Sequence, residues 1–541
     1  MNLRYVSRVV GLFLLCYAPT MLLPLLVGWL MDDSSPADGF ATTGAFVGAA
    51  GVTVALALLL LRAGERATGE FFRKESILSV ALVWYLAVAC SALPFVFSGS
   101  LGLVDGVFES ASGLTTTGAS AFGGGTTPKI SQLPSELLFW RALTHWIGGL
   151  GIIVMFLVVL PVMGTTQKRL YVVEVPGISK DTLRPKLTST VLVLFRIYLV
   201  LTLAIAAGYL AFGMNVFEAV CHSFATIATG GFSTRDYSIG EFGSLGIETV
   251  CLAGMLLSGT SFGLYYKAVD ELRRPPMHQE PAGPVQRLRR VFKVFWSHQE
   301  FRLYITMWLL VSLGITVTLV THGPAIPDPS GETHDYSQLG QALRGGSFAA
   351  ASLSTSTGFA NRDFLGWPFL AHALLILVML HGGCSGSTSG GLKVVRFLLM
   401  LKLVGRGFRR FLRPRRVEKS IHLGEGQSFD AAQLRDVVTF TAAWFVTLLV
   451  GGLAVLFLAE VDELTAFTSV LSCMGNIGPG ITEVLPHTLA PANDLGVSVG
   501  PYGSYGTLPA MAKLVLSFVM VAGRLEVYTA VVVFVPSFWR D

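Results

Sequence analysis

A short phrase of hydroxyl side chains and glycine returns four times along the chain, at intervals of about 120 residues. Its four copies are Thr115–Ala119, Ile227–Gly231, Thr355–Phe359 and Gly475–Pro479. Glycine adopts backbone angles that are closed to most residues and lets a ligand approach without a Cβ in the way. Backbone carbonyls and hydroxyl oxygens arranged as a ring are a ligand set for a dehydrated monovalent cation. The pattern therefore favours cation coordination over bond-breaking chemistry.

The elements around these phrases are strongly apolar. Of the 541 residues, 52% are hydrophobic and only 13% charged, which indicates a polytopic membrane protein. A helix needs about 20 apolar residues to cross the hydrocarbon core. Ten segments qualify, and the first is expected to be a retained span rather than a signal peptide. They are residues 9–31, 41–61, 77–98, 136–161, 189–212, 246–268, 302–322, 368–401, 437–459 and 508–535.

Four shorter apolar pieces lie between these spans, and each runs directly into one of the phrases. A helix of about 12 residues that ends in a glycine-containing phrase is too short to cross, so it is predicted to be re-entrant. The pieces are 105–116, 216–228, 341–355 and 463–474.

Charge orients the chain. The stretches 168–186, 267–293 and 393–435 are rich in Lys and Arg, whereas 323–340 and 480–507 contain acids and neither Lys nor Arg. The positive-inside rule places the basic loops and both termini in the cytoplasm. The basic run at 406–416 is interpreted as a topogenic and lipid-headgroup patch, with docking of a cytosolic partner as the alternative.

Two spans separate each phrase from the next, so all four phrases are expected on the same outer side of the membrane. The predicted fold is an all-α polytopic membrane protein with four parallel span, re-entrant pore helix, span repeats around one central pore, plus two extra N-terminal transmembrane helices. Irregular backbone is tolerated in a membrane where it is buried in protein or lines a water-filled path. The C-terminal dipoles of the short helices also favour a cation at the phrases.

Glycine and serine interrupt the long apolar segment 368–401 at residues 382–391. One interpretation is a kinked helix with small residues for close packing. The other is an unwound loop that lies across the pore below the phrases as a movable barrier. A nucleotide-binding P-loop is excluded because Leu392, not Gly, precedes Lys393. Lys393 itself is expected to be a charge at the cytoplasmic end of the span.

Arg524 lies inside the last apolar segment. A central Arg costs about 2.5–3.5 kcal/mol on insertion scales, so it is a functional candidate. Pairing with Glu526 or snorkelling to the surface would be a structural explanation, but residues two apart on a helix do not face each other. We expect Arg524 to face the pore as a cationic barrier.

Several further motifs accompany the four phrases. At these residues the chain resembles the Trk/Ktr/HKT potassium transporters, and most closely their bacterial TrkH subunits. The resemblance covers essentially the whole chain. The motifs are Trp146–Ile152, Cys221–Thr226, Gly382–Lys393 and Gly523–Val527.

The resemblance implies potassium uptake through a filter formed by the phrases, with a potassium ion bound there and no other cofactor. Serine at the first filter position accompanies sodium preference in plant relatives, and Gly118 stands there in this chain. The implied filter residues are Thr116, Thr117, Gly118, Ala228, Thr229, Gly230, Ser356, Thr357, Gly358, Asn476, Ile477 and Gly478. The implied gate residues are Gly382, Gly383, Ser385, Gly386, Ser387, Gly390, Gly391 and Arg524.

The same resemblance implies a location in the bacterial cytoplasmic (inner) membrane among lipid, a homodimer with one pore per chain, and a cytosolic TrkA-like nucleotide-binding ring as partner. No nucleic-acid partner is expected. The predicted division is 1–75 for the N-terminal helices, 76–165, 186–270 and 300–402 for repeats one to three, 403–435 for a basic cytoplasmic linker, and 436–541 for repeat four.

Other function classes fit the sequence less well. A sodium- or mixed-cation-permeable member of the same family is the nearest alternative. Secondary transporters of organic solutes usually have inverted or two-part repeats. An intramembrane enzyme would need a nucleophile with a base or a metal motif such as HExxH, and the chain contains neither, so no enzymatic activity is expected.

Isolated polar residues and the six cysteines receive structural interpretations. His145, His222 and His381 are expected to be buried and hydrogen-bonded, and the cysteines to be buried free thiols. Glu109 and Glu218 are explained by the helix dipole. Asp236 and Asp363 could attract cations to the mouth, or be neutralised by the preceding Arg235 and Arg362.

Overall fold

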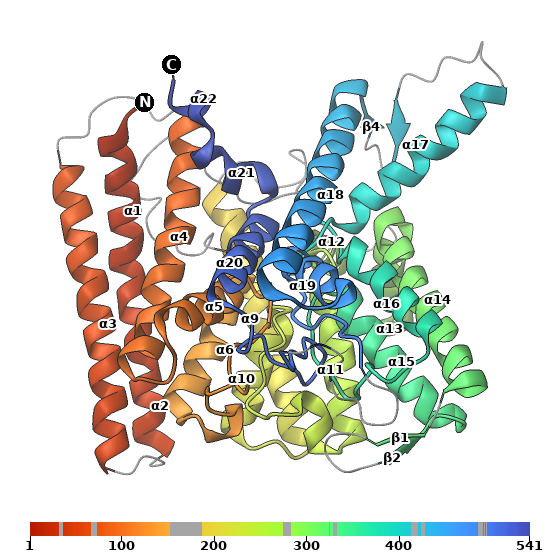
Figure 1. The fold of residues 1–541 in the computed structure, drawn as a ribbon. Helices are drawn as coiled ribbons and strands as arrows, with labels where there is room; N and C mark the ends of the chain where they lie inside the picture. Colours follow the sequence, from red (N-terminus) through yellow and green to blue (C-terminus); the bar gives the residue numbers. More distant parts are fainter. Residues whose placement is uncertain are drawn as a thin grey trace.

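The computed structural model is almost entirely helical in the part of the chain that it describes, which confirms the predicted all-helical membrane fold (Figure 1). The strands of the described residues form two short antiparallel pairs: β1 (Ala325–Pro327) pairs with β2 (Thr333–Asp335), and β3 (Ile421–His422) pairs with β4 (Ser428–Phe429). The description covers all residues except 32–35, 66–72, 152–186, 274–282, 324, 328–332, 413–419, 424–427, 485–490, 492, 494 and 541.

After the N-terminal helices, one order of elements recurs four times: a long helix, a short helix that ends at a phrase, and a second apolar helix. The N-terminal part is α1 (Leu3–Tyr17), η1 (Ala18–Leu22), α2 (Leu23–Met31) and α3 (Pro36–Ala63). The long helices are α4 (Arg73–Phe97), α9 (Leu187–Ala211), α14 (Gln299–His322) and α18 (Ala431–Ala459). The short helices are α5 (Leu103–Leu114), α10 (Val216–Ile227), α15 (Leu339–Ser354) and α19 (Glu463–Gly475).

The second helices are α6 (Ser135–Gly149), α11 (Leu245–Ser258), α16 (Phe369–His381) and α20 (Ala510–Arg524). The remaining elements connect or follow these. They are η2 (Ile130–Gln132), η5 (Ser238–Phe242), α12 (Phe262–Arg273), α13 (Pro284–Ser297), α17 (Val394–Leu412), α21 (Val527–Val531), η6 (Val532–Phe534) and α22 (Pro536–Trp539).

Ten spans were predicted, and the described residues show breaks inside three of these segments, of which the interruption of 368–401 by Gly and Ser was itself predicted. Within the described residues, six helices are long and apolar enough to cross a membrane, and a seventh candidate is the pair α11 and α12, bent by 90°. Glycine or a residue with positive φ stands at each of these breaks: Gly259 follows α11, and Gly382 and Glu526 have positive φ. The second half of the predicted span 136–161 lies outside the described residues. The interrupted segments are 246–268, 368–401 and 508–535.

The helix contacts close into a ring. Each short helix packs against the long helix before it and the second helix after it. The second helix of each group also packs against the short helix of the next group, in the pairs α6 with α10, α11 with α15, α16 with α19 and α20 with α5. The last pair joins the fourth group back to the first. The short helices and the phrases that follow them are therefore gathered at the centre.

Local sequence explains where the short helices begin. Asn215 caps α10 by accepting from the backbone N–H of Glu218, and Asp462 caps α19 by accepting from that of Thr465. Large apolar side chains stay exposed on the outer helices. On α14 they include Leu309, Leu310, Leu313 and Val317, as expected for a surface against lipid.

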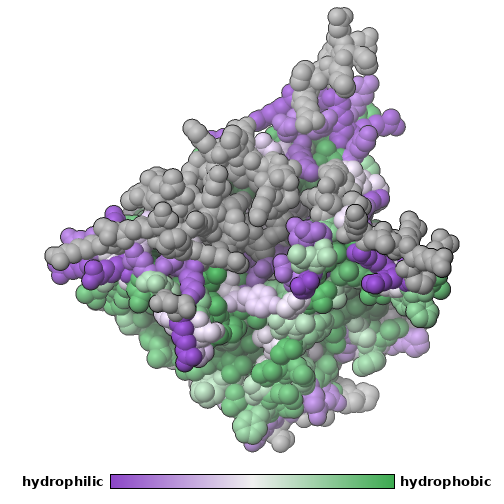
Figure 2. Space-filling model, turned by 90° about the horizontal axis from the view of Figure 1, so that it is seen from above, coloured by the Kyte–Doolittle hydropathy of each residue, from purple (hydrophilic) through white to green (hydrophobic). Residues whose placement is uncertain are grey.

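Figure 2 views the molecule from the end at which both termini lie. Hydrophobic residues cover the flank, and hydrophilic residues gather along the rim. The six cysteines are all free, and five of them are buried, while Cys16 is partly exposed. This confirms the interpretation of the cysteines as free thiols.

Candidate cation-binding site

The four short helices end in the same backbone motif. The last helical turn is closed by a left-handed residue, and the next residue donates its N–H to the carbonyl five positions earlier, as in a Schellman motif. The left-handed residues are Thr116, Thr229, Ser356 and Asn476, with φ between 51° and 56°. The closing bonds are Thr117 to Ser112, Gly230 to Ala225 and Thr357 to Ser352, each 2.8 Å, and Ile477 to Ser472 at 2.9 Å.

This motif fixes the register of the four copies. We define phrase 1 as residues 115–118, phrase 2 as 228–231, phrase 3 as 355–358 and phrase 4 as 475–478. The final residue of each phrase is a glycine with φ between 82° and 104°. In phrase 2 that glycine is Gly231, and Gly230 occupies the position of Thr117. The prediction that Gly230 is equivalent to Gly118 is therefore wrong by one residue, because two glycines stand side by side there.

The final glycines and the carbonyls before them form a closed ring. A methyl group placed on Gly118 would overlap the carbonyl oxygen of Gly230, and one on Gly231 would overlap that of Thr357. The same holds for Gly358 with the Ile477 carbonyl, and a methyl on Gly478 would lie 2.7 Å from the carbonyl oxygen of Thr117. Each phrase thus touches the next and the fourth touches the first. Only glycine leaves room for this approach.

Phrases 1 and 3 are braced by their own side chains. Thr115 and Thr117 share a hydrogen bond of 2.7 Å between their hydroxyls, and Thr355 and Thr357 share one of the same length. All four side chains are buried. The alternation of threonines in these phrases therefore fixes their backbone from within.

Phrase 2 lacks such a pair and is held by His145 instead. The Nδ1 of His145 donates to the carbonyl of Gly113 at 2.8 Å, and its Nε2 accepts from the N–H of Phe232 at 3.2 Å. One nitrogen donates and the other accepts, so the imidazole is neutral. His145, His222 and His381 are buried and hydrogen-bonded, which confirms that interpretation.

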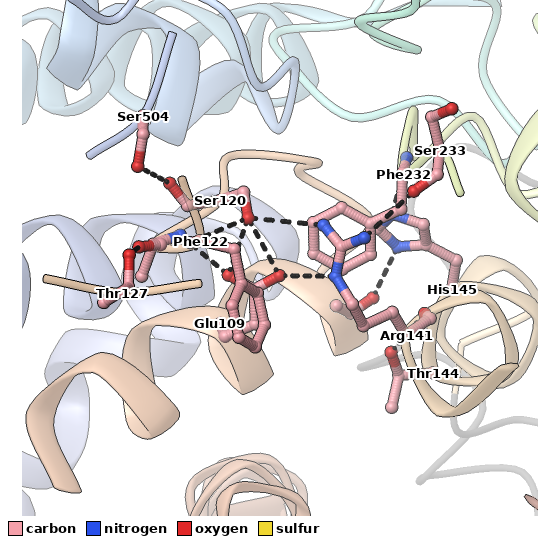
Figure 3. Close-up of polar contacts among 12 residues, drawn as sticks. Glu109, Ser120, Phe122, Thr127, Arg141, Thr144, His145, Phe232, Ser233 and Ser504 are labelled. Atoms are coloured by element: carbon pink, nitrogen blue, oxygen red, sulfur yellow. Dashed lines mark hydrogen bonds and ion pairs between the residues drawn. The ribbon is translucent and has the colours of Figure 1, made fainter. Parts of the chain in front are cut away.

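Behind phrases 1 and 2 lies a buried ion pair (Figure 3). Arg141 Nε donates to Glu109 Oε1 at 2.8 Å, and both side chains are almost inaccessible, at 2% and 0% exposure. The guanidinium also donates to the Ser233 carbonyl and lies 4.1 Å from the centre of the Phe232 ring. Glu109 further accepts from the backbone N–H of Ala121. Helix-dipole stabilisation was thus an incomplete explanation of Glu109, which joins the first two repeats through Arg141.

A cavity of about 200 Å³ opens onto the glycine end of the phrases. All four final glycines line it, together with Asp236. The loop Gly500–Tyr505, from the segment 484–507 to which the sequence assigned no role, lines its other side.

The charges beside this cavity do not pair as the sequence suggested. Arg235 bonds Glu218 at 2.5 Å and Glu241 at 3.5 Å rather than Asp236. Partial burial lowers the pKa of the Arg235 guanidinium, but the hydrogen bond and charge of Glu218 outweigh it, and the pKa is raised above its ordinary value. Asp236 accepts from the Ser131 hydroxyl, so its carboxylate is not neutralised by the preceding arginine.

At the opposite end of the phrases, residues 382–393 run without helix between α16 and α17. Ser389 bonds the Ser356 hydroxyl at 2.8 Å, and the N–H of Gly390 donates to the same hydroxyl at 2.6 Å. Thr388 donates to the carbonyl of Ile227 at 2.9 Å. A methyl on Gly390 would lie 2.5 Å from the carbonyl oxygen of Gly475. This loop therefore lies directly against phrases 3 and 4 and against Ile227, the residue that precedes phrase 2.

Arg524 connects the loop to α6 of the first repeat. Its guanidinium donates to the Thr388 carbonyl at 2.8 Å, to that of Gly148 at 2.5 Å and to that of Gly149 at 3.1 Å. A second cavity of about 90 Å³ is lined by Arg524 and by loop residues including Gly386, Ser387, Gly390 and Gly391. The loop and Arg524 are thus joined and lie together under the phrases.

Lys393 was predicted to be a charge at the cytoplasmic end of its span, but it lies inside the segment 368–401, immediately before α17. It is buried, has a positive φ of 67°, and donates from Nζ to the carbonyl of Ser389. Glu526 is paired with Arg396 of α17, in agreement with the expectation that it is a poor partner for Arg524.

Sequence reasoning missed Arg141, Tyr505 and the bracing role of His145. Arg141 and His145 carried a signal, since an ionisable residue in an apolar span is a functional candidate. Tyr505 stands in the Gly- and Pro-rich segment 484–507, where a tyrosine carries no such signal.

Comparisons with known proteins give the family. The family model described as TrkH, a cation transport protein, matches residues 72–540. The Trk system potassium uptake protein TrkH of Halomonas elongata is 36% identical over 546 residues, and that of Escherichia coli is 35% identical over 544, each alignment covering all of both chains. The crystal structure of the potassium transporter TrkH from Vibrio parahaemolyticus matches over 100% of both chains with a TM-score of 0.79 and 31% identity. The chain belongs to the TrkH family of cation transport proteins.

Proposed function

We propose that this protein takes up potassium through the centre of the ring formed by the four phrases. The observation that carries the proposal is the closed sequence of final glycines, each in contact with the carbonyl of the next phrase. Four such carbonyls around one axis can replace the hydration shell of a dehydrated cation. The relatives that are named potassium uptake proteins support potassium as that cation.

Two buried oxygens support a cation or water at the inner end of the ring. Thr116 Oγ1 and Asn476 Oδ1 have no hydrogen-bond partner within the described residues. A buried unpaired polar atom in a native structure calls for a water or ion. Both atoms belong to the left-handed residues of phrases 1 and 4, which contact each other through Asn476 Nδ2 and Thr117 Oγ1 at 3.0 Å.

The loop 382–391 and Arg524 act as the gate in this proposal. The loop contacts phrases 3 and 4 and Ile227 before phrase 2, and Arg524 bonds both the loop and α6, so cation exit requires the loop to move. A fixed guanidinium there also repels an emerging cation. We further propose that the protein lies in a bacterial cytoplasmic membrane with both termini in the cytoplasm. It would work as a homodimer with a TrkA-like nucleotide-binding ring.

Cation flux into liposomes tests the proposal, with potassium, rubidium and sodium measured separately. Gly358→Ser is the test variant, because any side chain there meets the Ile477 carbonyl and a positive φ of 84°. Gly340→Ser is the matched control, since nothing lies within 4 Å of a methyl at Gly340. We expect potassium and rubidium flux above sodium flux, with the preference weakened by Gly358→Ser alone.

Two results would count against the proposal. Equal or greater sodium flux in the wild type would indicate a sodium- or mixed-cation-permeable member of the family. An unchanged preference in Gly358→Ser would place the filter elsewhere.

A further inference from the structure

Phrase 4 has no internal brace of the kind found in phrases 1 and 3. Gly475 and Ile477 stand where Thr115 and Thr117, or Thr355 and Thr357, form hydroxyl pairs. The side-chain amide of the left-handed Asn476 donates to the Thr117 hydroxyl of phrase 1 and to the Met520 carbonyl, each at 3.0 Å. These bonds support the inner end of phrase 4. The outer end, at Gly478, needs support from another part of the chain.

Tyr505 supplies that support from the outer loop of the fourth repeat. Its hydroxyl donates to the carbonyl of Gly478 at 2.9 Å. Its side chain is buried, with the residue 2% exposed, and its ring packs against that of Phe108 with centroids 5.4 Å apart. Its own N–H donates to the Ser120 carbonyl at 2.9 Å. The ring and backbone of Tyr505 are thus fixed by the first repeat, and its hydroxyl points at the fourth phrase.

The geometry points to Tyr505 as a positioning residue of the filter, whose hydroxyl holds the outermost carbonyl of phrase 4 and thereby sustains discrimination between potassium and sodium. This inference rests on the proposed function of the ring. A carbonyl oxygen has two lone pairs, so one can accept from Tyr505 while the other faces a cation. A carbonyl that is held in place resists moving inward toward the smaller sodium ion, whereas a free one can follow it.

Tyr505→Phe is the test variant, because it removes the hydroxyl and keeps the ring against Phe108. Tyr85→Phe is the matched control: it also removes a tyrosine hydroxyl that donates to a backbone carbonyl, that of Ala530 at 3.2 Å, and Tyr85 lines neither of the two cavities described above. The readout is the ratio of potassium to sodium flux in liposomes containing the full chain. The ratio of potassium to sodium flux depends only on the molecules that conduct, so it can still be measured if part of a variant misfolds.

We expect Tyr505→Phe to lower the ratio about two- to tenfold, the range implied by loss of one neutral hydrogen bond. The Tyr85→Phe ratio should stay at the wild-type value. If Tyr505 has a merely structural role, Tyr505→Phe will reduce the potassium and sodium fluxes together and leave their ratio unchanged. That result would overturn the inference. The proposed function would still stand, provided that the wild type prefers potassium. A wild-type protein without potassium preference would instead overturn the proposed function, and this inference with it.

Discussion

The left-handed residue of each phrase has a positive φ, a backbone conformation that residues with a side chain rarely adopt. Thr116 and Thr229 are β-branched and have φ of 56° and 54°, a conformation that costs of order 1–3 kcal/mol for such residues. It persists because the Schellman bonds, the threonine pairs and buried partners such as His145 fix the surrounding atoms. The same strained backbone conformation recurs at the equivalent position of all four repeats. A chance effect of packing would not recur in this way, so the strain is a structural feature of the site.

The buried pair Arg141–Glu109 gives a prediction at this scale. Glu109→Gln leaves the Arg141 guanidinium buried without its counter-charge, which typically costs about 3–5 kcal/mol. Thermal unfolding of the purified protein should therefore shift clearly downward. Adding Arg141→Met should recover part of the loss, because the uncompensated charge is then gone.

Glu241→Gln serves as the control, because Glu241 faces Arg235 at a partly exposed site where an ion pair is worth about 0–1 kcal/mol. If Glu109→Gln were no more destabilising than Glu241→Gln, the pair would not be the brace described here.

At the scale of the elements, the second helix of every repeat ends just beyond the phrases. Among the second, third and fourth repeats, the break before the next helix is longest in the third, from Gly382 to Lys393, and that segment contacts residues of the other repeats. Arg524 stands at the interruption of the fourth repeat and bonds carbonyls of the first and third. This segment can act as a movable barrier because moving a non-helical segment breaks fewer backbone hydrogen bonds than unwinding a helix.

Arg524→Ala should raise potassium flux in liposomes that lack any partner protein. The substitution removes the bonds that tie Thr388 to Gly148 and Gly149, together with the positive charge under the ring. Arg435→Ala, at an exposed position on α18, is the control for loss of an arginine. Flux equal to the wild type with and without a partner ring would argue against Arg524 as part of the gate.

The sequence predicted the short helices closely because each apolar run ends at its phrase; α10 and α19, for example, agree with 216–228 and 463–474 to within a residue. It did not predict the register of phrase 2, since adjacent glycines 230 and 231 give no sign of which adopts positive φ. Hydropathy does not reveal bends, so the breaks inside 246–268 and 508–535 were not predicted, whereas glycine and serine at 382–391 did predict the break inside 368–401. Braces such as Glu109 with Arg141 join residues too distant in sequence for spacing rules to connect.

On the scale of the whole molecule, ion pairs join neighbouring repeats around the ring. Glu248 of α11 pairs with Arg344 of α15 at 2.7 Å, and Lys513 of α20 pairs with Asp105 of α5. Arg141 of α6 bonds the Ser233 carbonyl beyond phrase 2. These bonds join neighbouring repeats at three of the four junctions around the ring, which favours a fixed separation of the phrases there.

The most direct test of the central claim is anomalous diffraction from crystals of the protein grown in rubidium, a conducted stand-in for potassium. The account predicts rubidium density on the axis of the ring, between the carbonyls of Thr117, Gly230, Thr357 and Ile477. Absence of density there, in a preparation that conducts rubidium in liposomes, would show that the cation passes by another route and would contradict the account.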